Sequence, residues 1–213
     1  MEKEKYYFIF DVESDGLYGK AIAWGAALYN SKGTVVKESL KINVSILKEC
    51  REPFVKTNVI PVLYRAYEDS FTTEDLLHPS LEPSCNVQTT YQLRQAFMQF
   101  YLECKAEFPQ MTVWADVAFP VETNFLTACV EDISSLSKDT VSYGIYDMPY
   151  PLYEIANVVH HEINRTAQYL NNRQTDAFNS VVDDARGYAK HNPLFDVHAS
   201  AYCLFTVTAR FMI

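Results

Sequence analysis

The N-terminal part of the chain alternates between apolar runs and short polar turns. The run from Tyr6 to Asp11 is aromatic and β-branched, which is typical of a buried strand. A second apolar run extends from Ala21 to Tyr29, and the tight-turn signal Ser31-Lys32-Gly33 separates it from a third segment, Thr34 to Val44. Three such runs joined by short turns predict an antiparallel meander.

The remainder of the chain has mainly helical patterns. Apolar residues recur at helical spacing until Pro109 ends the first helix, and Pro120 stands where a first helical turn accepts proline. Met111 to Ala115 predicts a short strand between these two helices. Residues 46–90 hold four prolines and no clean period, which predicts irregular structure with one or two helices. The predicted helices cover residues 90–108, about 120–131, 152–170 and 193 to the C-terminus.

Strands followed by alternating strands and helices predict an α/β fold. The sheet is expected to be mixed, antiparallel in its first strands and flanked by α-helices. A chain of 213 residues suits one such domain, which would bury roughly 70% of the surface of the unfolded chain. Its 48% hydrophobic and 21% charged residues are ordinary for a globular protein. We therefore expect a single domain over residues 1–213.

The composition restricts the function only loosely. A formal net charge of -9 disfavours a dedicated duplex binder, yet a nuclease that holds cations on its own carboxylates is compatible with it. Five cysteines, an odd number without C-x-x-C spacing, predict buried thiols in a reducing compartment. The N-terminus does not resemble a signal peptide, and no apolar stretch approaches the ~20 residues of a membrane span. We therefore expect a soluble, cytoplasmic protein without a membrane partner.

Two carboxylates stand two positions apart where the first predicted strand ends. Asp11 and Glu13 project to the same side, because side chains alternate along a strand. Like charges held together at the end of a buried strand repel each other unless a cation lies between them. The pair therefore predicts a divalent-metal site, and the distant His191 and Asp196 are the candidates to complete it.

These motifs resemble those of the DEDDh family of 3′-5′ exonucleases, and in particular its RNase T-like branch. The first motif of that family is Asp-x-Glu followed by Gly or a small residue and then an apolar one, which matches Asp11 to Leu17. The last motif is His-x-x-x-x-Asp at the start of the final helix, which matches His191 to Asp196. The resemblance implies a ribonuclease H-like fold and one 3′-5′ exonuclease domain spanning nearly the whole chain.

The second motif departs from the family pattern, which places an Asp in the first turn of a helix. Asp116 has the expected residue type but lies directly at the end of a predicted strand. Glu122 follows Pro120 in the predicted first turn, with the large apolar Phe125 three positions later, so the register favours Glu122. Either carboxylate has an alternative role as a helix cap or as a partner of the helix dipole.

The resemblance also implies a mechanism with two Mg²⁺ or Mn²⁺ ions. Asp11 would bridge both ions, and Glu13, Asp196 and the carboxylate of the second motif would bind them directly or through water. His191 would act as the general base that deprotonates the attacking water. The expected activity is hydrolysis of nucleic acid to 5′-mononucleotides.

The expected substrate is single-stranded RNA or DNA with a free 3′ end, with RNA slightly favoured. Leu17 resembles the family residue that wedges against terminal bases, and Tyr18 is a candidate for base stacking. Lys190 is equally consistent with a phosphate contact and with a solvated helix face. Family members are often dimers, so the resemblance also implies a possible homodimer. The rival hypothesis is a catalytically silent module that binds a nucleic-acid end or another protein.

Overall fold

A four-stranded mixed sheet lies at the centre of the part of the chain that the computed structural model describes, residues 4–70, 85–115, 118–139 and 191–205. Its strands follow the order β3 (Val35–Ile42), β2 (Ala21–Asn30), β1 (Tyr6–Ser14) and β4 (Thr112–Ala115). The pairs β1–β2 and β2–β3 are antiparallel, whereas β1 and β4 are parallel. This arrangement confirms the predicted α/β class with an antiparallel start.

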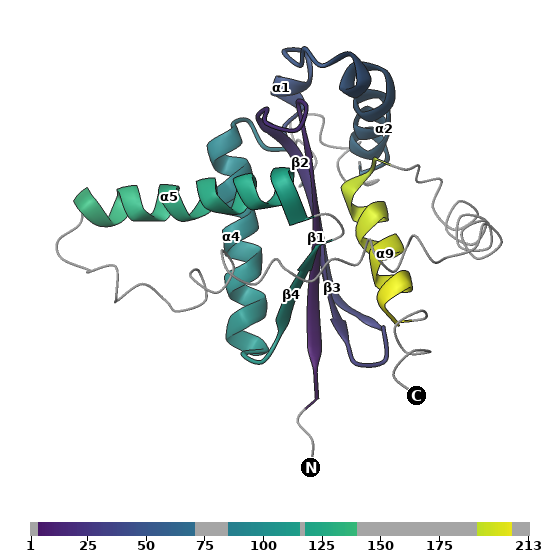
Figure 1. The fold of residues 1–213 in the computed structure, drawn as a ribbon, viewed down its shortest axis with the longest axis vertical. Helices are drawn as coiled ribbons and strands as arrows, with labels where there is room; N and C mark the ends of the chain where they lie inside the picture. The colour runs from purple at the N-terminus through teal and green to yellow at the C-terminus, as the bar shows by residue number, and fades with distance from the viewer. Residues whose placement is uncertain (1–3, 71–84, 116–117, 140–190, 206–213) are drawn as a thin grey trace, which may run out of the picture.

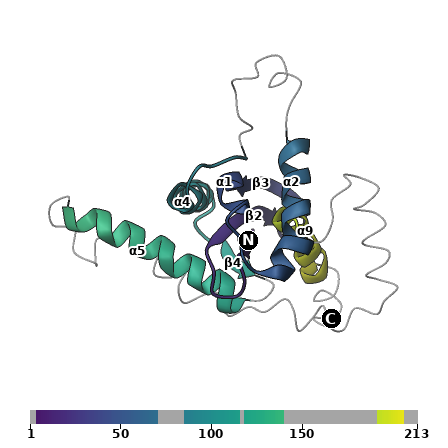
Figure 2. The same ribbon diagram turned by 90° about the horizontal axis from the view of Figure 1, so that it is seen from above.

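Helices cover both faces of the sheet. Figures 1 and 2 show α4 (Thr90–Glu107) and α5 (Thr123–Asp139) on one face and α9 (Pro193–Cys203) on the other. The segment after β3 confirms the expected one or two helices in its described part. It contains α1 (Val44–Leu47), the π-helical turn η1 (Val55–Val59) and α2 (Ile60–Asp69). Within the described residues, no helix combines the length and the apolar character that crossing a membrane requires.

Alternation along β1 separates two packing environments. Phe8, Phe10 and Val12 belong to the large buried cluster formed with α4 and α5. Ile9 instead packs with Val197 and other apolar residues of α9. Because successive side chains of a strand point to opposite faces, residues 11 and 13 share the α9 face with Ile9.

Two predicted element boundaries are wrong in a way that affects the site. β1 does not end at Asp11 but continues to Ser14, because β2 pairs with it across a bulge between Glu13 and Ser14. The helix expected from about residue 120 begins at Thr123 and follows a wide turn, η2 (Ala118–Glu122), with extended backbone at Phe119. The helix predicted over residues 152–170 lies outside the described residues.

Four of the five cysteines confirm the expectation of buried thiols. Cys50, Cys85, Cys104 and Cys129 are buried and unpaired in the structure. Burial raises the pKa of the Cys50 and Cys104 thiols to about 11. These thiols are therefore neutral packing groups at physiological pH and not nucleophiles.

Candidate metal centre and its adjoining pocket

The N-terminus of α9 is defined by local sequence. Asn192 is the N-cap, 1% exposed, and its side-chain oxygen accepts the N–H of Leu194 at 3.0 Å. Pro193 follows in the first turn, where a missing N–H has no cost. His191 therefore lies immediately before the helix and Asp196 inside its first turn, so one helix start presents both side chains.

Gly25 of β2 allows this helix start to reach the sheet. It pairs with Asp11 across β1 and β2. A Cβ atom at position 25 would lie 2.3 Å from the nitrogen of Leu194 and 2.4 Å from the carbonyl carbon of Pro193. No side chain larger than hydrogen fits at this distance. No sequence pattern indicates this role, because Gly25 is embedded in an apolar run.

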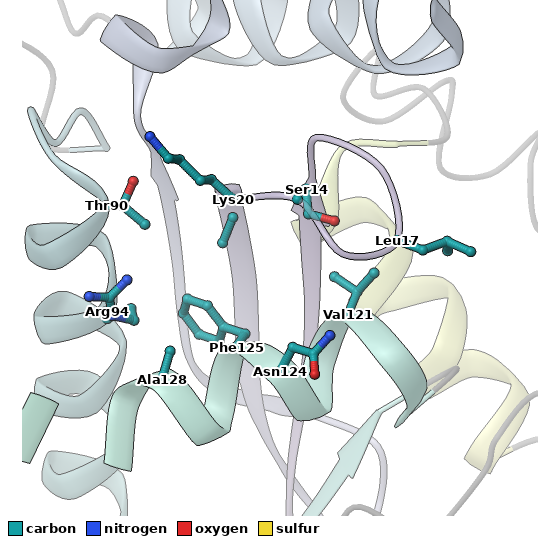
Figure 3. Close-up of a pocket in the computed structure, with 11 residues that line it drawn as sticks. Ser14, Leu17, Lys20, Thr90, Arg94, Val121, Asn124, Phe125 and Ala128 are labelled. Carbon is teal, nitrogen blue, oxygen red and sulfur yellow. The ribbon is translucent and has the colours of Figure 1, made fainter. Parts of the chain in front are cut away.

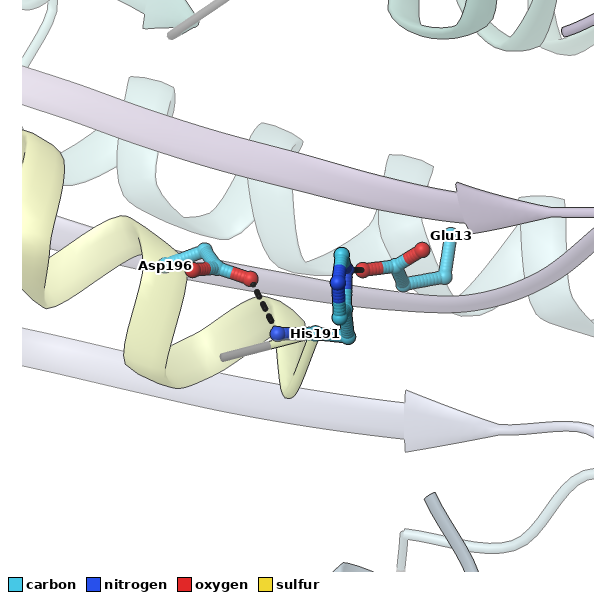
Figure 4. Close-up of side chains that lie close together, drawn as sticks. All are labelled: Glu13, His191 and Asp196. Atoms are coloured by element: carbon cyan, nitrogen blue, oxygen red, sulfur yellow. Dashed lines mark hydrogen bonds and ion pairs between the residues drawn. The ribbon is translucent and has the colours of Figure 1, made fainter. Parts of the chain in front are cut away.

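Glu13, His191 and Asp196 come together at this point (Figure 4). One potential ligand atom from each residue lies within 4.8 Å of the others. The Nδ1 atom of His191 is 3.5 Å from Oε1 of Glu13, and both side chains are largely buried. The backbone N–H of His191 donates to Oδ2 of Asp196 at 2.9 Å. The predicted convergence of the first strand and the last helix is thus present in the structure.

His191 adopts a backbone conformation that is unusual for a residue with a side chain. Its φ angle is 75°, in the left-handed region. Such a conformation costs about 1–3 kcal/mol and persists only where the surroundings enforce it. Here the hydrogen bond to Asp196 holds the backbone of His191, and Phe54 packs edge-on against its ring with centroids 5.4 Å apart.

The remaining predicted ligands are placed less completely. Asp11 is half-buried on the α9 face of β1, opposite Gly25, but is not part of the three-residue group within 4.8 Å. Glu122 is 6% exposed at the end of η2, which contacts β1. A carboxylate so deeply buried requires a hydrogen-bond partner or a cation. Asp116 lies outside the described residues, so the choice between the two second-motif candidates stays open.

A pocket of about 520 Å³ adjoins the three-residue group. Glu13 and His191 form its polar side, and Leu17, Phe54, Val55 and Val59 provide much of its apolar wall. Leu17 is 62% exposed and Phe54 is 54% exposed, so both present apolar surface at the opening. A flat, partly polar ligand would suit these walls, and an anionic group on it could approach the carboxylates only through a bound cation.

Of the predicted substrate contacts, Leu17 lines this pocket, whereas Tyr18 does not line it and Lys190 lies outside the described residues. Tyr18 is 77% exposed on the loop between β1 and β2, next to the pocket wall. No pattern in the sequence singles out Phe54, since it stands in the proline-rich segment that lacks a clear period.

Asp15 connects the loop that bears Leu17 with the segment that precedes Phe54 by hydrogen bonds. Its carboxylate accepts the N–H of Arg51 at 3.0 Å from both oxygens and the N–H of Glu52 at 2.9 Å. The loop that bears Leu17 is thereby joined to the segment that leads into Phe54. The sequence offered no signal for this contact, because the partners are 36 and 37 residues away.

The donor set suits a hard divalent cation. Glu13 and Asp196 offer carboxylate oxygens, the ligands that Mg²⁺ and Mn²⁺ prefer, and Asp11 lies on the same face. No protein-family model matches the sequence, and no curated protein matches it either. The functional inference therefore depends on this geometry and on the two sequence motifs.

Proposed function

We propose that the protein is a metal-dependent 3′-5′ exonuclease acting on single-stranded nucleic acid, with a ribonuclease H-like fold. The observation that supports this most strongly is the approach of Glu13 to His191 and Asp196, which come from opposite ends of the sequence. The strand order β3-β2-β1-β4 supports it too, because β1 lies centrally between an antiparallel and a parallel neighbour. The first and last DEDDh motifs then share one site.

The metal ligands would be Asp11, Glu13, Asp196 and either Glu122 or Asp116. Two bound Mg²⁺ or Mn²⁺ ions would supply a hydroxide nucleophile and neutralise charge on the phosphate and on the leaving 3′ oxygen. The chain's own contribution begins with carboxylates that are held close together before any ion binds. Gly25 contributes by letting α9 approach β1 closely enough for these ligands to meet.

His191 is the proposed general base. An imidazole titrates near neutrality, so it can take a proton from the attacking water and release it to solvent. Glu13 at 3.5 Å orients the ring and would stabilise its protonated form, and Phe54 packs edge-on against the same ring. The hydrogen bond from the His191 backbone to Asp196 keeps the residue that bears the base next to this ligand.

The pocket beside this centre would hold the 3′-terminal nucleoside. Leu17 and Phe54 would contact the base through apolar surface, which favours no particular base edge. The net charge of -9 supports a short or single-stranded substrate, which needs fewer phosphate contacts than a long duplex. The preference for RNA over DNA, the homodimer and the cytoplasmic location stay predictions.

The test uses one oligonucleotide labelled at its 5′ end and another labelled at its 3′ end, each incubated with Mg²⁺ or Mn²⁺. We expect stepwise shortening from the 3′ end, loss of activity with a chelator and loss of activity in Asp11→Ala. Asp69→Asn, which removes an exposed acid at the end of α2, is the matched control and should behave as wild type. Absence of cleavage with every strand type and both metals would contradict the proposal.

The second candidate is a catalytically silent module of the same fold. The observation that favours it is that the three-residue group contains no carboxylate from the second motif among the described residues. This candidate predicts measurable oligonucleotide affinity without calorimetric heat on addition of Mn²⁺. An endonuclease is distinguished separately, because it would cut circular single strands and an exonuclease would not.

A further inference from the structure

A second pocket lies on the other side of the loop that bears Leu17 (Figure 3). Its volume is about 130 Å³, and it lies between the β1–β2 loop and helices α4 and α5. Ser14, Leu17 and Val121 line both this pocket and the larger one beside the metal centre. The two pockets are therefore neighbours that share part of their lining, Leu17 included.

The size of the second pocket restricts what enters it. An engineered protein cavity of about 150 Å³ binds one benzene molecule, so a pocket of about 130 Å³ matches a single six-membered ring in size. Phe125 supplies an aromatic wall, and Ala128 leaves the space open on the same helix. Phe125 is buried and packs edge-on against Phe97 at 5.2 Å, so its ring is fixed in position.

Polar side chains from both helices line this small pocket. Arg94 is held by Asp132 through Nε–Oδ2 and Nη2–Oδ1 contacts of 2.5 and 3.0 Å. A guanidinium has five N–H groups, so one that donates two hydrogen bonds to a carboxylate keeps three further donors. The amide of Asn124 and the hydroxyl of Thr90 also line the pocket, and Asn124 offers both a donor and an acceptor.

We infer that the second pocket binds a pyrimidine base, the base of the nucleotide that precedes the 3′-terminal one. This inference rests on the proposed exonuclease function. Consecutive bases of one strand would lie on the two sides of Leu17, the terminal base in the larger pocket and its neighbour in the smaller one. A pyrimidine ring fits the volume and stacks on an aromatic wall, and its carbonyl oxygens accept hydrogen bonds from Arg94 or Asn124. A purine, with its second ring, would extend beyond this volume.

The test uses RNA pentanucleotides that differ only in the residue next to the 3′ end, which is U, C, A or abasic. Removal of the terminal nucleotide is measured in single turnover. Affinity is measured separately in EDTA by anisotropy of a 5′ fluorophore. For the wild type we expect the U and C substrates to be cleaved at least about fivefold faster, and bound at least about fivefold more tightly, than the A and abasic substrates. A fivefold ratio corresponds to the lower range of base stacking on an aromatic ring.

Two variants probe the pocket without touching the carboxylates. Ala128→Leu fills the pocket and should lower the cleavage rate and the affinity of the U and C substrates to those of the abasic substrate. Asn124→Ala, at an exposed position that tolerates substitution, should reduce the preference for U and C by about threefold through loss of a hydrogen bond. Thr127→Leu places the same leucine side chain at an exposed position of α5 that does not line the pocket, and should behave as wild type.

The outcomes separate the two proposals. Cleavage at equal rates for all four substrates, unchanged in Ala128→Leu, overturns the pyrimidine pocket and leaves the exonuclease intact. No cleavage, together with tighter binding of U and C that Ala128→Leu abolishes, supports the pocket and overturns the exonuclease. Neither cleavage nor base-dependent binding overturns both.

Discussion

The two faces of β1 have opposite chemistry although they belong to one nine-residue strand. Towards α4 and α5, Phe8, Phe10 and Val12 lie in a continuous apolar core. Towards α9, Ile9 is buried, but Asp11 and Glu13 take the next two positions on that face. One face therefore contributes stability, while the other gives up apolar burial to hold carboxylates together. Substitutions on the two faces should have separable effects.

The largest effect on activity is expected for Glu13→Gln. A metal centre contributes several kcal/mol to transition-state stabilisation, so the loss in kcat should be about a thousandfold. In the absence of metal, the melting temperature should stay level or rise, because one of several neighbouring like charges is removed. Glu49→Gln, an exposed acid outside the cluster, is the control for both assays. A large fall in melting temperature would show that Glu13 has a structural role instead.

The opposite face should respond in the opposite way to Phe10→Ala. Phe10 is fully buried and packs against Phe97 at 5.3 Å, so its truncation should lower the free energy of unfolding by about 3–5 kcal/mol. Urea denaturation measures this loss. The protein that remains folded should keep its activity per folded molecule within a few-fold. A loss of activity as large as that of Glu13→Gln would remove the distinction between the faces.

Gly25→Ala tests the contact between the α9 face and the helix itself. The added Cβ would lie 2.3 Å from the nitrogen of Leu194, so the start of α9 has to move. Overpacking against side chains costs about 1–3 kcal/mol, and this clash should cost at least as much because backbone atoms have to shift. Activity per folded molecule should fall further than in Phe10→Ala, because His191 and Asp196 move away from Glu13. Equal activity in the two variants would contradict this account of Gly25.

The smallest of these effects is expected for Asp15→Ala. Loss of the bonds to Arg51 and Glu52 loosens the loop relative to the segment before Phe54. We expect KM to rise about tenfold, corresponding to loss of a charged hydrogen bond, while kcat changes little. Asp15→Asn keeps an acceptor oxygen and should lie between the wild type and Asp15→Ala. A fall in kcat with unchanged KM would place Asp15 in the chemistry instead of in the pocket wall.

The sequence predicts one set of features because they depend on local pattern. Alternation in β1 places Asp11 and Glu13 on one side of the strand, and the pattern from Asn192 onward starts a helix. The two motifs therefore indicated which residues would meet. The end of β1 was misplaced, since pairing with β2 and not the propensity of Asp11 decides where the strand stops.

The features that the sequence does not predict depend on long-range contacts. Gly25 matters only because α9 approaches that particular position of β2, and Asp15 only because residues 51 and 52 lie beside it. The register of Glu122 depends on the turn η2, whose extended backbone at Phe119 delays the start of α5. None of these positions has a periodic or motif signal of its own.

The most direct test of the central claim is anomalous diffraction from a crystal soaked with Mn²⁺. We predict two peaks on the α9 face of β1, within about 2.0–2.3 Å of carboxylate oxygens from Asp11, Glu13 and Asp196, in the range of bonds from hard cations to oxygen. The same map would show whether Glu122 or Asp116 reaches an ion. Peaks absent from this face, or Asp196 turned away from Glu13 in the soaked crystal, would contradict the account.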